Sequence, residues 1–124
     1  MGEPHILLVE DSALVSEALR VLFEETGHRV TVAASAAEAV ETVVADSPDV
    51  MLLDLGLPDA DGLTVLESLR ARGVAIPMTV ALTGDGDDAT VARCRAAGCK
   101  EVLLKPVSPR ELIRKVEYWT GTKR

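Results

Sequence analysis

The chain has 124 residues, the size of one domain, and that length buries roughly two thirds of the surface of the unfolded chain. Its formal net charge is −7, from 20 acidic and 13 basic residues. Direct binding of nucleic acid needs clustered cations, so we expect none, and no apolar run approaches the roughly 18 residues that cross a bilayer.

The composition indicates the kind of core that this domain builds. Hydrophobic residues make up 48% of the chain, but aromatic residues only 2%, which predicts an aliphatic core such as that of helices packed on a buried parallel sheet. Cys94 and Cys99 form no CxxC pair, and no histidine cluster or signal peptide accompanies them. We therefore expect reduced thiols in a cytoplasmic protein.

The first half of the chain alternates short apolar runs with amphipathic segments of helical length. Residues 5–9 read as a buried strand, and Ser12 is a suitable N-cap for a helix that ends near Thr26. Residues 28–34 alternate between apolar and polar side chains, which indicates an edge or half-exposed strand. A second helix is expected over residues 36–45.

The second half repeats the same alternation. The expected elements are a strand at 50–53, a helix near 63–71, a strand at 78–82, a helix near 89–97, a strand at 101–104 and a helix near 110–119. The sequence thus predicts five βα units in one domain spanning residues 1–124, with a core from about 5 to 120 and no internal linker.

Four of the expected strands are followed or ended by reactive polar residues. Glu10 and Asp11 follow the first strand, Asp54 the third, Thr83 the fourth and Lys105 the fifth. Parallel strands place their carboxyl ends at one edge of the sheet, where open α/β sheets bind ligands. Three carboxylates, a hydroxyl and an ammonium group at one edge suit a divalent cation together with a phosphoryl group.

The carboxylates carry the metal hypothesis. Three of them close together repel one another unless a cation lies among them, and Mg²⁺ accepts a few carboxylate oxygens while keeping waters for phosphate. Taken alone, Glu10 and Asp11 also fit as acids at a helix N-terminus. Asp54 follows an apolar strand, so we expect a partly buried nucleophile or ligand, or else a structural aspartate bonded to loop amides.

The two remaining polar residues have a choice of roles. Lys105 leaves an apolar strand, where an unpaired ammonium group is costly, so it needs an anion such as Asp54 or a phosphoryl oxygen. Thr83 is compatible with an ordinary strand residue or with a hydroxyl that donates to a phosphoryl oxygen.

This arrangement resembles the receiver domain of two-component response regulators, the family that includes the chemotaxis response regulator. The resemblance covers essentially the whole chain, and the joint order and spacing of its motifs are specific. The stretches that carry it are residues 6–12 (ILLVEDS), 54–62 (DLGLPDADG), 81–84 (ALTG) and 104–106 (LKP).

The resemblance implies a phosphoacceptor function for this chain. Asp54 would take a phosphoryl group from a histidine kinase or a histidine phosphotransfer protein. Asp11, Asp54 and the backbone carbonyl of Gly56 would ligate Mg²⁺, with Mn²⁺ as a substitute, and Glu10 would act through a bound water. Only self-phosphorylation from a phosphodonor and slow autodephosphorylation would follow, not enzymatic turnover.

The resemblance also implies how the signal is read. Lys105 would pair with a phosphoryl oxygen, Thr83 would move toward it after transfer, and the Lys105–Pro106 bond would be cis. The fold implied is a flavodoxin-like (βα)5 sandwich with strand order 2-1-3-4-5. A partner surface, for example of a homodimer, would lie on the fourth helix, fifth strand and last helix.

One departure from the family concerns its output relay. The family usually has Tyr or Phe three residues before the strand-five lysine, where this chain has Val102, and Val107 follows the proline where Phe is common. Reorientation of an aromatic ring therefore cannot transmit the signal here.

The same residues suggest two alternative functions. A haloacid-dehalogenase-like phosphatase needs a second aspartate two residues after the nucleophile, where this chain has Gly56. A receiver fold that serves only as a docking module would not need the complete acidic set, Thr83 and Lys105. Whether the receiver stands alone or is part of a larger regulator or hybrid kinase is left open by the sequence.

Overall fold

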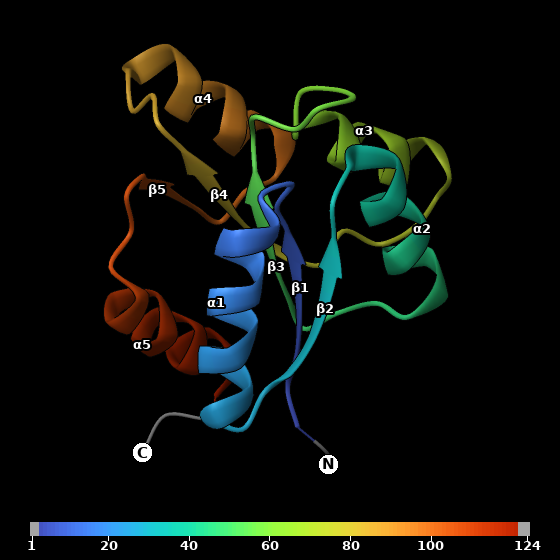
Figure 1. The fold of residues 1–124 in the computed structure, drawn as a ribbon. Helices are drawn as coiled ribbons and strands as arrows, with labels where there is room; N and C mark the ends of the chain where they lie inside the picture. Colours follow the sequence, from blue (N-terminus) through green and yellow to red (C-terminus); the bar gives the residue numbers. More distant parts are fainter. Residues whose placement is uncertain (1–2, 122–124) are drawn as a thin grey trace.

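The computed structural model describes residues 3–121 as five alternating strands and helices (Figure 1). The elements are β1 His5–Val9, α1 Ala13–Glu25, β2 Arg29–Ala33, α2 Ala36–Ala45, β3 Val50–Asp54, α3 Thr64–Ala71, β4 Met78–Thr83, α4 Asp88–Ala97, β5 Glu101–Leu104 and α5 Pro109–Thr120. These bounds match the predicted elements to within one or two residues, which confirms the five βα units.

The strands form one parallel sheet in the order β2-β1-β3-β4-β5, which confirms the order implied by the resemblance. β1, β3 and β4 occupy the centre, and nearly all of their side chains are buried. β2 lies at one edge and is mostly half-buried, as its alternating pattern predicted. The carboxyl ends of the strands consequently meet at one edge of the sheet.

Helices cover both faces of this sheet (Figure 1). On one face α1 and α5 pack against Ile6 and Leu8 of β1, and on the other α2, α3 and α4 pack against Leu7 and Val9. Successive strand residues point to opposite faces, so one apolar strand contributes to both layers. Phe23 is the only fully buried aromatic residue in the described part of the chain, and the core is otherwise aliphatic.

Side-chain caps set the starts of four helices. Ser12, Ser35 and Ser108 accept hydrogen bonds from backbone N–H groups in the first turns of α1, α2 and α5. Asp87 does the same for Thr90, which starts α4 one residue earlier than the sequence predicted. An N-cap side chain satisfies an N–H group that the helix itself leaves unpaired.

Cys94 and Cys99 are buried free thiols, and burial raises the pKa of Cys99 to about 12. Among residues 3–121, no helix combines the length and the apolar character that a membrane crossing requires.

Candidate functional site

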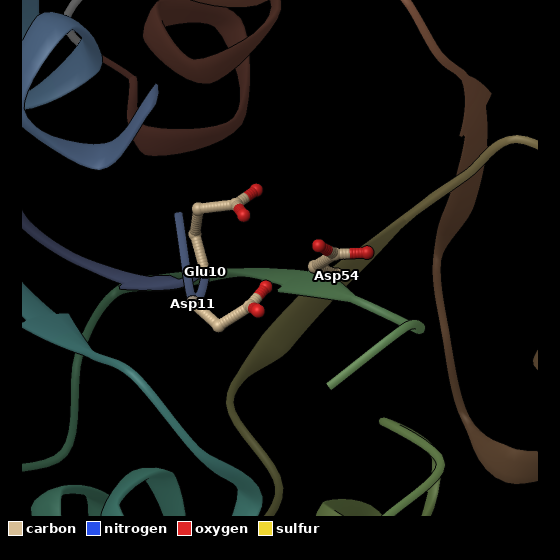
Figure 2. Close-up of side chains that lie close together, drawn as sticks. All are labelled: Glu10, Asp11 and Asp54. Atoms are coloured by element: carbon tan, nitrogen blue, oxygen red, sulfur yellow. The ribbon is translucent and has the colours of Figure 1, made fainter. Parts of the chain in front are cut away.

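Three carboxylates gather at the carboxyl edge of the sheet (Figure 2). Glu10, Asp11 and Asp54 each offer an oxygen, and these oxygens lie within 4.8 Å of one another. The pairing of β1 with β3 produces this cluster, because Val9 lies beside Leu53 and the residues that follow both reach the same edge. The sequence prediction that these acids converge is therefore confirmed.

The cluster combines buried and exposed groups. Asp54 is 3% exposed and Glu10 is 7% exposed, while Asp11 lies on the surface. Burial raises the pKa of Glu10, and the charges of Asp54 and Asp11 raise it further, against a hydrogen bond from the Ser12 N–H and the charge of Lys105. Hard oxygen donors that repel one another in this way fit a divalent cation such as Mg²⁺.

The Asp54 carboxylate is fixed by two contacts from different segments. Its Oδ1 lies 3.1 Å from Nζ of Lys105 and accepts a hydrogen bond of 3.0 Å from the N–H of Gly56. The expected pairing of Lys105 with Asp54 is therefore present. The argument that an unpaired ammonium group would be costly here was too strong. The Lys105 side chain is 39% exposed, because β5 lies at an edge of the sheet.

Thr83 ends β4 at the same edge but bonds to its own loop. Its buried hydroxyl accepts from the N–H of Asp85 at 3.0 Å and lies 3.4 Å from the carbonyl oxygen of that residue. The register pairs Asp54 with Leu82, so Thr83 is one residue further along the neighbouring strand. The structure thus brings Thr83 to the edge without a hydrogen bond to the acidic cluster.

The loop between β3 and α3 closes tightly over the end of β3. Gly62 donates its N–H to the carbonyl of Leu55, and a Cβ on Gly62 would lie 2.4 Å from the backbone oxygen of Asp54. Only glycine fits such a close approach. This requirement was missed from the sequence alone, because it depends on a backbone contact between residues eight positions apart.

The two valines that depart from the family pattern lie on opposite sides of the sheet. Val102 packs into the core beneath α2, α3 and α4, and Val107 packs on the opposite side of the sheet. The Lys105–Pro106 peptide bond is cis, as the resemblance implied.

Sequence comparison identifies the family to which this architecture belongs. The family model for the response regulator receiver domain matches residues 6–117. The virulence transcriptional regulatory protein PhoP of Salmonella typhimurium is 32% identical over 112 residues, which is 90% of this chain and 50% of PhoP. The Escherichia coli K12 PhoP protein is 33% identical over the same shares. The chain thus spans about half the length of these curated relatives.

Solved structures give the same result. The receiver domain of a Francisella response regulator superposes with a TM-score of 0.87 at 27% identity, covering 98% of this chain and 100% of that one. The receiver domain of a sensor histidine kinase from Pseudomonas aeruginosa, solved with a magnesium ion coordinated in its active-site cleft, gives a TM-score of 0.81 at 31% identity, covering 97% and 99%. The chain therefore belongs to the response regulator receiver domain family of two-component signalling.

Proposed function

We propose that Asp54 is the phosphoacceptor of this receiver domain and that a phosphohistidine of a histidine kinase or histidine phosphotransfer protein supplies the phosphoryl group. The phosphorus–nitrogen bond of the donor breaks, a bond from phosphorus to an Asp54 oxygen forms, and the imidazole nitrogen keeps the electron pair. The observation that supports this most directly is the burial of Asp54 between Lys105 Nζ and the Gly56 N–H, at 3.1 and 3.0 Å.

The residues around Asp54 provide what phosphoryl transfer needs, which is positioning and neutralisation of charge. Asp11, Asp54 and the Gly56 carbonyl would hold Mg²⁺ or Mn²⁺, and Glu10 would do so through a water. The bound cation would neutralise charge on the transferred group. Lys105 would then pair with a phosphoryl oxygen, and Thr83 would exchange its bonds to Asp85 for one to the phosphoryl group.

Incubation with acetyl phosphate and Mg²⁺, followed by intact-protein mass spectrometry, tests the acceptor. We expect one phosphoryl adduct on the wild type and none on Asp54→Ala or in the presence of EDTA. The control Asp85→Ala, which removes a nearby exposed carboxylate, should still be modified. An adduct that survives Asp54→Ala, or a wild type that stays unmodified, would refute phosphoacceptance at Asp54, and the second result would favour a docking module.

The metal ligands are tested separately by calorimetric titration with Mg²⁺. Asp11→Ala removes an exposed carboxylate from the cluster, and we expect the affinity to fall about tenfold or more, the scale on which loss of a metal's protein ligands or their supports is felt. Glu25→Ala removes the same charge at the other end of α1 and serves as the control. Equal affinities of Asp11→Ala and the wild type would contradict the ligand role.

An apolar groove beside the site supports docking of the phosphodonor. Its lining includes Glu10, Lys105 and Pro106 at the site and Leu14 and Val15 of α1. Leu14 is 85% exposed, so the groove has an apolar rim next to the acceptor carboxylate. A helix of the histidine-bearing partner would cover this groove and place the partner's imidazole near Asp54. A receiver that meets such a partner would lie in the cytoplasm. The surface of α4, β5 and α5 remains the proposed surface for a homodimer.

Phosphatase activity is the second function that can be tested with the same variants. Turnover of a small phosphomonoester that is lost in Asp54→Asn would favour a haloacid-dehalogenase-like reaction. The family match and Gly56 at the position of the required second aspartate weigh against it.

A further inference from the structure

The helix α4 is held to the rest of the domain by little apolar packing. Of its ten residues only Cys94 is buried, whereas α2, of the same length, buries four. Burial of apolar area is the main force that holds a helix on a sheet. The position of α4 therefore depends on its polar contacts more than the position of α2 does.

Two arginines make those contacts. One lies in α4 and reaches the loop before α3, and the other lies in α3 and reaches α4. Arg93 of α4 places its Nη2 3.0 Å and its Nη1 3.4 Å from Oδ2 of Asp61. At the C-terminal end of the helix, Nη2 of Arg70 in α3 donates to the carbonyl of Ala97 at 2.6 Å. The middle of α4 and its C-terminal end thus each have one arginine link.

The Arg93 link leads back to the acidic cluster through the backbone. Asp61 forms an isolated antiparallel bridge with Gly56, and the N–H of Gly56 donates to Oδ1 of Asp54 at 3.0 Å. The other carboxylate oxygen of Asp61 accepts from the N–H of Leu63 at 2.9 Å, which fixes the side chain toward α3. Three consecutive contacts therefore connect Asp54 with α4.

We propose that Arg93 is a positioning residue, which acts through Asp61 to couple the loop at Asp54 and Gly56 to α4. In this chain the coupling takes the place of a ring in β5, where Val102 stands. It deepens the proposed function, because a ligand at the acidic cluster that moves Gly56 would also move Asp61 and shift α4. Coupling of this kind is reciprocal, so α4 would in turn influence cation binding.

The size of the effect follows from the exposure of the pair. The Arg93 and Asp61 side chains are 55% and 44% exposed, and exposed ion pairs change equilibria by up to about fivefold. This is enough to shift a helix that is otherwise weakly packed, and too little to unfold the domain, so the variants below are expected to fold.

Hydrogen–deuterium exchange of the free protein tests the link without any ligand. In Arg93→Gln, we expect amides of residues 54–62 to exchange about two- to fivefold faster than in the wild type, the range that an exposed ion pair supplies. Arg95→Gln removes a charge from the same helix at a residue without an ion pair in the described chain, and should leave residues 54–62 unchanged. Arg93→Lys keeps the charge and should restore slow exchange.

Unchanged exchange at residues 54–62 in Arg93→Gln, or equal acceleration in Arg95→Gln, would overturn the coupling. A second measurement repeats the exchange with Mg²⁺ and beryllium fluoride, a phosphoryl mimic. The wild type should then show changed exchange in residues 88–97, and Arg93→Gln should not. If residues 54–62 of the wild type do not respond to these ligands, the proposed acceptor site fails, while the free-protein comparison still decides whether Arg93 couples the loop to α4.

Discussion

Asp54 owes its environment to its own strand, to the loop that follows directly and to the distant end of β5. Its strand places the carboxylate at the sheet edge, the Gly56 N–H holds one oxygen, and Lys105 reaches the same oxygen from the end of β5. Each contact alone is common for a structural aspartate. Their combination with Glu10 and Asp11, within 4.8 Å, produces a site that carries excess negative charge and has hard oxygen donors.

Gly62 is the residue at which the backbone leaves no room. We expect Gly62→Ala to destabilise the domain by about 1–3 kcal/mol, the usual cost of over-packing, because its Cβ would lie 2.4 Å from the Asp54 carbonyl oxygen. Gly84→Ala adds a Cβ where nothing lies within 4 Å and should be close to neutral. Urea unfolding of both variants measures the difference, and equal stabilities would show that the loop can shift at no cost.

At the scale of elements, Asp59 links the loop of the site to the N-terminus of α2. Its two oxygens accept from the N–H groups of Ala36 and Ala37 at 2.9 and 3.1 Å, and these hydrogen bonds lower the pKa of Asp59. A carboxylate at a helix N-terminus also interacts favourably with the helix dipole. This single side chain therefore joins α2 to the β3–α3 loop across 22 and 23 positions of the sequence.

We expect Asp59→Asn to lower the midpoint temperature of unfolding by a few degrees at pH 7, since the amide retains one acceptor and no charge. Because the pKa of Asp59 is lowered in the folded state, its contribution is present above the usual value of 3.8 and is lost as the pH falls through the folded-state value. The gap between wild type and variant, followed by thermal denaturation, should thus narrow as the pH falls below the usual value of 3.8.

Asp88→Asn is the control for Asp59→Asn, because Asp88 is likewise an exposed acid beside a helix N-terminus, but it belongs to that helix itself and makes no cross-link among the described residues. If Asp88→Asn costs as much as Asp59→Asn, the helix dipole rather than the link from the loop accounts for the loss.

The elements also show why part of the site was predictable and part was not. Glu10, Asp54, Thr83 and Lys105 could be placed because parallel strands bring their carboxyl ends to one edge, and the apolar runs marked where each strand ends. The link from Asp61 to Arg93 spans 32 residues and joins two exposed side chains. Such contacts leave no periodic pattern, so neither this pair nor the Asp59 cross-link could be predicted.

The burial of Lys105 could not be predicted for a related reason. Its strand is apolar in sequence, yet β5 is an edge strand whose residues are half-buried or exposed, and Leu104 is 57% exposed. Apolar composition indicates a strand, whereas burial depends on what covers it, and α4 covers β5 only sparingly. The pairing with Asp54 was predicted correctly, because it depends on strand ends and not on burial.

At the scale of the whole molecule, the two edges of the sheet have different chemistry. The carboxyl edge carries the acidic cluster, and the amino edge carries His5, a buried histidine whose Nε2 lies 2.8 Å from the Thr31 hydroxyl. Its Nδ1 has no hydrogen-bond partner within the described residues and lies 3.9 Å from Asp46, which pairs with Arg29. Burial lowers the pKa of His5, and the Arg29 charge lowers it further, against Asp46 and Asp49.

This lowered pKa makes the stability of the folded domain sensitive to mild acid. The unfolded chain binds the proton at the usual pKa of 6.5 and the folded chain only at a lower pH, so the contribution of His5 is complete above 6.5 and is lost as the pH falls through the folded-state value. The slope for one proton is at most about 1.4 kcal/mol per pH unit. The raised pKa of Glu10 acts in the opposite direction.

Because of that opposition, the slope of the wild type alone does not isolate His5. We expect His5→Gln, whose amide can still bond to Thr31, to lose less stability than the wild type when urea unfolding is compared between pH 7.5 and 5. The acidic cluster is unchanged in this variant, so its contribution cancels in the comparison. Parallel pH profiles for the two proteins would mean that His5 binds its proton at the same pH in the folded and unfolded states, and that the acid sensitivity of the fold arises elsewhere.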